Sequence, residues 1–115
     1  MTDTARNYVV QAATIPLDDD PLDADQVVSG SPEVGVHEIL DDDAVAVGVW
    51  QHTTGVSTDV EVDEVFVVLS GRATIEVEGG PTLEVGPGDV GVLGAGARTR
   101  WTVHEDLRKV YLITG

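Results

Sequence analysis

The sequence contains no cysteine, and Lys109 is its only lysine. Without cysteine the chain can form neither disulfides nor thiolate metal sites, and it has no thiol nucleophile. Aromatic residues are scarce as well, at 4% of the chain. No apolar run approaches the ~20 residues of a membrane span, and residues 1–11 lack the pattern of a signal peptide. We therefore expect a cytoplasmic protein that does not associate with membranes.

Acidic residues greatly outnumber basic ones, which gives a formal net charge of -15 at pH 7. The negative surface potential repels the phosphate backbones of nucleic acids and anionic lipid headgroups, so neither is an expected partner. Acidity of this degree is typical of a salt-adapted protein and by itself indicates no particular chemistry. The aspartates of residues 17–26 also lack the glycine and the terminal glutamate of an EF-hand calcium loop.

Hydrophobic residues, 42% of the chain, are mainly aliphatic and occur in short runs separated by turn formers. β-Branched side chains suit a pleated sheet, and the glycines and prolines between the runs allow the chain to reverse. The pattern predicts an all-β sandwich or barrel without helices, apart from a single turn at 105–107. The predicted strands cover residues 34–40, 44–53, 60–70, 73–78, 82–85, 90–93, 99–104 and 108–113.

A chain of 115 residues is long enough for one domain with one modest core. We expect an N-terminal part, residues 1–32, that consists of a short strand at 7–15 and an acidic surface loop at 17–26. The remaining residues, 33–115, are expected to form the barrel.

Alternation of apolar and polar residues predicts which face of two strands lies inside this barrel. In residues 73–77 the odd-numbered positions are apolar and the even-numbered ones polar. Around Trp101 the odd-numbered positions are again the inward set, and Arg98 and Arg100 fall on the outward face. The expected inward residues are Ala73, Ile75, Val77, Thr99, Trp101 and Val103.

Two segments resemble the two conserved blocks of the cupin superfamily. The first runs from Asp63 to Arg72 and has the expected spacing from glutamate to glycine, and the second is the turn Gly86-Pro87-Gly88-Asp89. A further set of motifs resembles the small cupin branch that includes ureidoglycine aminohydrolase. This set consists of Val28-Ser29-Gly30-Ser31-Pro32, Gly48-Val49-Trp50, Trp101-Thr102-Val103 and Arg108-Lys109-Val110-Tyr111.

The resemblance implies a double-stranded β-helix, or jelly-roll, barrel with a pocket at its open end. It also implies a homodimer formed through N-terminal strands, which would give residues 8–15 a role. Metal-binding members supply three histidines and one glutamate, a set that suits a transition metal. Here the resemblance places Thr58, Val60 and Thr99 at the histidine positions, and only the carboxylate, Glu64, is present. We therefore expect no bound metal and no cofactor.

The three histidines of the chain lie outside these ligand positions. A shifted metal site is an alternative, in which Asp59, Glu61 or Glu64 approaches His52 across the barrel. We favour the simpler interpretation of His52 as a histidine that caps a turn near a strand end.

Glu64 is the expected catalytic residue, because the resemblance directs it into the barrel, where a carboxyl group can act as a general acid or base. The alternative is a structural carboxyl group that is held by a neighbouring hydroxyl or by Arg72. Aromatic rings in the barrel would offer a planar or apolar ligand a large contact area. The expected pocket-lining residues are Thr58, Val60, Thr99, Trp50, Trp101, Phe66 and Val103.

The leading hypothesis is a metal-independent cupin that binds a small organic metabolite and performs isomerisation, cyclisation or elimination by acid–base chemistry. A non-catalytic binding or regulatory cupin is the first alternative. A metal-dependent hydrolase resembling ureidoglycine aminohydrolase is the second. The sequence leaves open whether the protein is an enzyme, because a fold does not by itself assign a function.

Overall fold

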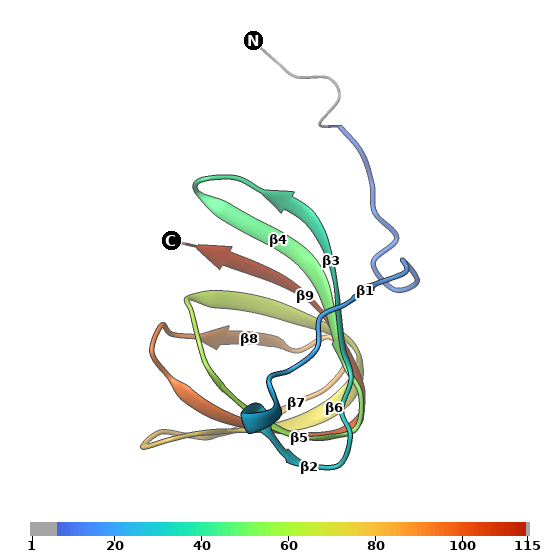
Figure 1. The fold of residues 1–115 in the computed structure, drawn as a ribbon. Helices are drawn as coiled ribbons and strands as arrows, with labels where there is room; N and C mark the ends of the chain where they lie inside the picture. The colour runs from blue at the N-terminus through green and yellow to red at the C-terminus, as the bar shows by residue number, and fades with distance from the viewer. Residues whose placement is uncertain (1–6, 115) are drawn as a thin grey trace.

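The structure, a computed structural model, describes residues 7–114. Their strands form one antiparallel, nine-stranded sheet that curls into a barrel (Figure 1). In chain order the elements are β1 (Asp18–Asp19), the 3-10 turn η2 (Ala24–Gln26), β2 (Val27–Ser29), β3 (Val34–Asp41), β4 (Val45–His52), β5 (Gly55–Val60), β6 (Glu64–Val77), β7 (Thr82–Val85), β8 (Val90–Leu93) and β9 (Arg98–Thr114). The all-β jelly-roll barrel predicted from the sequence is confirmed. No helix within the described range is long and apolar enough to cross a membrane.

Strand β9 is the central element of the barrel because it pairs on both of its edges along most of its length. One edge pairs first with β5 and then with β4, and the other edge pairs with β6. Strand β6 pairs in addition with β7 and β8. The two longest strands therefore hold the two sides of the curled sheet together.

Gly71 marks a change of register in the middle of β6. Before it the even-numbered residues Phe66 and Val68 are buried, whereas after it the odd-numbered Ala73 and Ile75 are buried. Three register shifts between Val68 and Ala73 form a bulge in the pairing with β9, where five steps along β6 correspond to six along β9. The net shift of one residue accounts for the switch, since a one-residue slip turns a strand over. Gly71 adopts a φ of +87°, a conformation that other residues rarely adopt.

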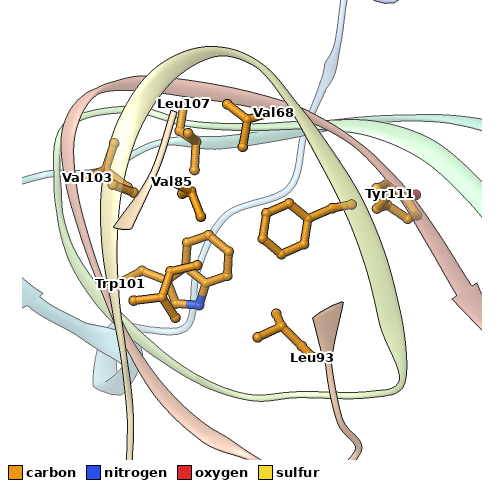
Figure 2. Packing of buried hydrophobic residues seen from close by; sticks show 10 residues of the cluster. Val68, Val85, Leu93, Trp101, Val103, Leu107 and Tyr111 are labelled. Carbon is orange, nitrogen blue, oxygen red and sulfur yellow. The ribbon is translucent and has the colours of Figure 1, made fainter. Parts of the chain in front are cut away.

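The hydrophobic core lies between β6 and β9 and includes residues from the short strands β7 and β8. Figure 2 shows side chains of these strands converging on the barrel interior, among them Trp101, Leu93 and Leu107. The buried cluster is Phe66, Val68, Ala73, Ile75, Val85, Leu93, Trp101, Val103, Leu107 and Tyr111. The inward faces predicted from alternation are confirmed, with Val77 only half-buried, and Arg98 and Arg100 are exposed as expected.

Several predicted strand boundaries are wrong. The strands predicted at 60–70 and 73–78 are replaced by one continuous strand, β6, which begins only at Glu64 and ends at Val77. Those predicted at 99–104 and 108–113 are likewise parts of one strand, β9, with strand instead of a helical turn at 105–107. Strand β5 was missed because its sequence, which begins at Gly55 and mixes Ser, Thr and Asp with Val, carries little apolar alternation. Its extended conformation is instead stabilised by backbone pairing with β9.

The N-terminal part also differs from the prediction. Residues 7–15 form no strand, and a turn occupies 12–14. This segment lies against the barrel through Arg108, which donates to the carbonyl oxygens of Ala13 and Ile15, and through the Tyr8 hydroxyl, which donates to the Ile39 carbonyl. The acidic stretch 17–26 is not a simple surface loop, because β1 within it pairs with β3. The homodimer stays a prediction. Of the two parts predicted from the sequence, 1–32 and 33–115, residues 1–6 and residue 115 lie outside the described range.

We expect Gly71→Ala to destabilise the barrel more than Gly79→Ala does. Both glycines have positive φ, but an added Cβ at Gly71 would overlap the Asp106 carbonyl, whereas nothing lies within 4 Å of one at Gly79. Gly79→Ala should cost about 1 kcal/mol from its backbone conformation. Gly71→Ala should cost about 1–3 kcal/mol more because of overpacking. Urea denaturation measures both, and equal losses would show that close packing at the bulge is unimportant.

Candidate functional site

A pocket of about 520 Å³ opens beside the core. Its walls come from β3, β4, β5, β6 and β9, and the segment at 20–26 borders it. Trp101 and Tyr111 belong both to the core and to the pocket wall. A cavity of this size suits a small organic ligand.

An ion pair between Lys109 and Glu64 lies in this pocket. The Lys109 Nζ donates a hydrogen bond of 2.6 Å to Glu64 Oε2, and the two side chains are only 6% and 7% exposed. Glu64 is the first residue of β6, and Lys109 lies on the inward face of β9 between Leu107 and Tyr111. Removing two charges from water is costly, so a buried pair of this kind requires close mutual contact.

Three aromatic rings surround the ammonium group of Lys109. The Nζ lies 4.4 Å from the ring centroid of Trp50, 4.6 Å from that of Phe66 and 4.8 Å from that of Trp101. Trp50 is the direct cross-strand partner of Lys109, which places both side chains on the same face of the sheet. The negative faces of the rings attract the cation and replace part of its hydration.

Only some of the predicted pocket residues line this pocket. Trp50 and Trp101 line the pocket, whereas Phe66 and Val103 lie in the core and form no part of its lining. Thr99 is buried and lines a second, neighbouring hollow instead of this pocket.

Thr58 and Val60 border both hollows but lie on the outward face of β5. Their cross-strand partners are Arg100 and Arg98, which are exposed, whereas Ser57 and Asp59 pair with the buried Trp101 and Thr99. Directly paired residues share a face, so Ser57 and Asp59 lie on the side of β5 that carries the buried residues of β9. Ser57 is buried there, whereas Asp59 is exposed near the end of the strand.

Glu61 holds the edge of the indole of Trp101. Its Oε2 accepts hydrogen bonds from Thr99 Oγ1 at 2.6 Å and from Trp101 Nε1 at 3.0 Å. The neighbouring Asp59 has its pKa raised, first by burial and then by the charge of Glu61. The lining therefore carries acidic groups besides Glu64.

His52 forms a second buried polar group in the pocket. Its Nδ1 lies 2.6 Å from the Thr53 carbonyl oxygen and therefore carries the proton, so Nε2 accepts from the Ser57 hydroxyl at 2.8 Å. Burial is the main reason that the pKa of His52 falls below its ordinary value, and the hydrogen bond to Thr53 acts in the opposite direction. Both ring nitrogens are engaged, which argues against the shifted metal site.

The donor groups of the interior do not fit a transition metal. The described residues contain no group of three histidine, cysteine or acidic side chains that could hold a metal ion. At the inward positions of β5 stand a hydroxyl and a carboxylate, and Glu64 is already bonded to Lys109. This set lacks the imidazoles that Mn, Fe, Ni or Zn favour in such barrels.

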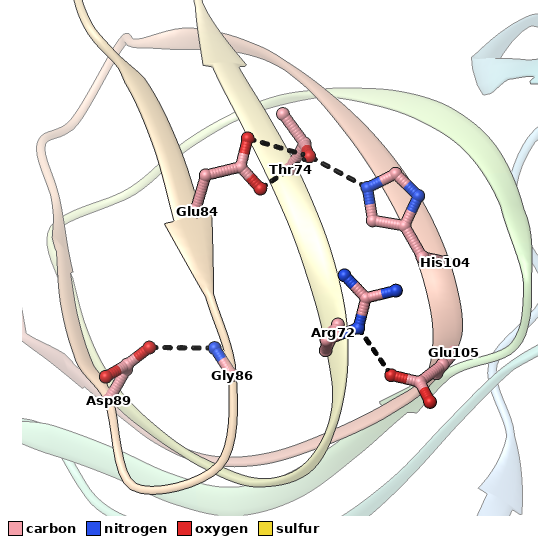
Figure 3. A network of polar contacts seen from close by, with 7 residues as sticks. All are labelled: Arg72, Thr74, Glu84, Gly86, Asp89, His104 and Glu105. Atoms are coloured by element: carbon pink, nitrogen blue, oxygen red, sulfur yellow. Dashed lines mark hydrogen bonds and ion pairs between the residues drawn. The ribbon is translucent and has the colours of Figure 1, made fainter.

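Lys109 was not identified as a site residue from the sequence. Arg72 was considered as a partner of Glu64, and this pairing is wrong. Arg72 instead pairs at the surface with Glu105, at 2.6 Å, beside the hydrogen-bonded group of Thr74, Glu84 and His104 (Figure 3). A signal for Lys109 was present, because the only lysine of the chain stands between two apolar residues of the same parity, Leu107 and Tyr111.

The free energy of unfolding should decrease as the pH falls from about 7 to about 5, in part because of His52. Below pH 6.5 the unfolded chain takes up a proton at this residue, whereas the folded protein keeps it neutral until its lower pKa is reached. The stability that His52 contributes is therefore lost as the pH falls. His52→Gln should flatten this dependence in urea denaturation, and an unchanged slope would contradict it.

Lys109→Met should lower the free energy of unfolding by about 3–5 kcal/mol, because it leaves the buried Glu64 carboxylate without a partner. The double variant Glu64→Leu/Lys109→Met should be more stable than Lys109→Met, since it removes both charges. Arg72→Met is a matched control, because the pair of Arg72 and Glu105 has the same 2.6 Å length but is 59% and 61% exposed. It should cost less than about 1 kcal/mol. Equal costs for the two single variants in urea denaturation would refute the buried pair.

Comparison with known proteins agrees with this architecture. The sequence model described as the EutQ-like cupin domain matches residues 40–111. The EutQ protein of Clostridium difficile has 15% sequence identity and a TM-score of 0.75, over 97% of this chain and 90% of that one. A protein of unknown function from Pseudomonas syringae pv. tomato has 27% identity and a TM-score of 0.78, over 87% of this chain and 45% of that one.

An ectoine synthase from P. lautus has the same fold, with 18% identity and a TM-score of 0.65, over 81% of this chain and 71% of that one. A sequence comparison with curated proteins gives no significant match. The narrower resemblance to the ureidoglycine aminohydrolase branch stays a prediction. Because the family match covers more than half of the sequence, the chain belongs to the EutQ-like cupin domain family.

Proposed function

We propose that this protein binds a small organic molecule in the 520 Å³ pocket without a transition metal, with Glu64 and Lys109 as its acid–base pair. The observation that carries the proposal is the hydrogen-bonded ion pair, 2.6 Å long and buried, within that pocket. The ammonium group of Lys109 supplies a fixed positive charge beside Glu64, where the family resemblance implies a metal ion.

The distribution of cationic side chains supports a functional role for Lys109. In a chain with 21 acidic residues and one lysine, that lysine is not at the surface, where it would offset the negative charge. It is 4% exposed and lies in the pocket wall. Burial of a charged pair rarely adds stability over apolar packing, so stability alone gives little reason for it.

The proposed chemistry is proton transfer, as in isomerisation, cyclisation or elimination. Lys109 donates a hydrogen bond to an oxygen of the ligand and stabilises negative charge that develops there. Glu64 removes or returns a proton at a neighbouring atom. The rings of Trp50 and Trp101 provide flat apolar walls for the rest of the molecule.

A non-catalytic binding protein is the second candidate, and the closed hydrogen bond of the ion pair favours it. A ligand that leaves this bond intact is held but not transformed. Turnover therefore separates the two candidates, whereas binding is common to both.

Ligand binding should change the intrinsic fluorescence of the protein, because Trp50 and Trp101 are its only tryptophans and both line the pocket. A panel of small carboxylates, amines, aldehydes and neutral metabolites can be screened by titration. A compound that binds in the pocket should give a saturable fluorescence change in wild type. Its Kd should rise about tenfold or more in Lys109→Met, because a charge-assisted hydrogen bond is lost. Absence of any saturable response across the panel would contradict the proposal.

Glu64→Gln should abolish turnover of any substrate found in that screen while leaving its binding detectable. The amide keeps the shape of the side chain but cannot accept a proton as a base. A loss of about 10²-fold or more in kcat would support general acid–base catalysis. Unchanged turnover would exclude Glu64 as the acid or base, and binding without turnover in wild type would favour the non-catalytic candidate.

A further inference from the structure

We propose that the amine of Lys109 forms a reversible imine with a small, uncharged or amine-bearing aldehyde or ketone. This inference rests on the proposed function, because it concerns the same pocket, and it adds a substrate class and a covalent step. It is carried by three observations, which are the enclosure of the amine, the proton acceptor beside it and the charge of the pocket wall.

The surroundings of Lys109 suit a nucleophilic amine. Its side chain is 6% exposed, and three aromatic rings lie within 4.8 Å of Nζ. The rings exclude water and neither donate nor accept strong hydrogen bonds, so once Glu64 has taken a proton from the ammonium group, the lone pair of the amine stays available. Lysines in desolvated pockets are the residues that form Schiff bases with carbonyl compounds in proteins.

Glu64 provides the proton transfers that imine formation needs. The carboxylate takes a proton from the ammonium across the 2.6 Å hydrogen bond, which leaves a neutral amine and a carboxylic acid. The amine nitrogen attacks the carbonyl carbon while the carbonyl oxygen takes the proton back from Glu64. The resulting carbinolamine loses its hydroxyl group, with a proton, as water, and a protonated imine remains beside the Glu64 carboxylate. No oxidant, reductant or further reactant is needed, since one water leaves for each C=N bond formed.

The charge of the pocket wall defines the kind of carbonyl compound. Besides Glu64, the carboxyl groups of Asp20, Asp23, Asp59 and Glu61 line the pocket, and within residues 7–114 Lys109 is the only lysine or arginine that lines it. Once the lysine is used in the covalent bond, no lysine or arginine of the lining remains to pair with an anionic substituent. An α-keto acid would thus be repelled, whereas a hydroxyl or ammonium group on the ligand finds acceptors.

The sequence makes a direct test possible, because amine-directed chemistry has only Lys109 and the α-amino group as targets. Folded protein is incubated with glycolaldehyde and cyanoborohydride, which reduces imines to stable amines, and peptide mapping gives the labelling rate of each amine. The same measurement is made on the chain unfolded in urea. The α-amino group serves as the internal reference in both conditions.

If the pocket activates Lys109, its labelling relative to the α-amino group should be at least about tenfold faster in the folded protein than in urea. A purely structural lysine gives the opposite result, because the fold would protect it, and slower labelling in the folded protein overturns the proposal. Glu64→Gln should remove the acceleration. Glyoxylate, the anionic probe, should show less acceleration than glycolaldehyde, and an equal acceleration would overturn the assignment of an uncharged or amine-bearing substrate.

Tryptophan fluorescence in the same samples separates the two proposals. Protection of Lys109 together with a saturable response to other ligands would overturn the imine and leave the proposed binding function standing. Protection together with no response to any ligand would overturn both.

Discussion

The ion pair of Glu64 and Lys109 sets the conditions that the rest of the barrel interior must meet. Two charges with 6% and 7% exposed side chains are tolerated only if each is close to the other and to polarisable groups. The polarisable groups around the ammonium group are the rings of Trp50, Phe66 and Trp101. Glu61 in turn fixes the indole of Trp101 through its N–H. The aromatic and acidic groups nearest to Lys109 thus form one connected arrangement around a single cation.

The backbone brings the two partners together through the pairing of β6 with β9. Glu64 belongs to the half of β6 whose even-numbered residues face inward, and Lys109 to the odd-numbered inward face of β9. The bulge at Gly71 allows β6 to keep this arrangement and yet bury the odd-numbered Ala73 and Ile75 against the other half of β9. A regular β6 would direct one of its two halves outward. The bulge therefore supports both the core and the site.

The sequence predicted the barrel, the strands β7 and β8 and the inward faces around Ile75 and Trp101, because turn formers and alternation are local signals. It did not predict strand β5, the residues of β5 that face inward, or the bulge in β6, because all three depend on pairing with β9. Glu64 was identified from a family motif, whereas Lys109 was passed over within another. A buried charge has no local signature beyond its parity on the strand, and its partner becomes evident only when the two strands are placed side by side.

The nitrogen-15 NMR signal of the Lys109 ammonium group tests the central claim most directly, since a chain with one lysine gives a single side-chain ammonium resonance. An exposed ammonium group exchanges its hydrogens with water too quickly to be detected near neutral pH, whereas a buried and hydrogen-bonded one is protected. The account predicts a protected resonance in wild type that loses its protection in Glu64→Gln. Exchange in wild type as fast as that of free lysine would contradict the buried pair, and with it the site built around it.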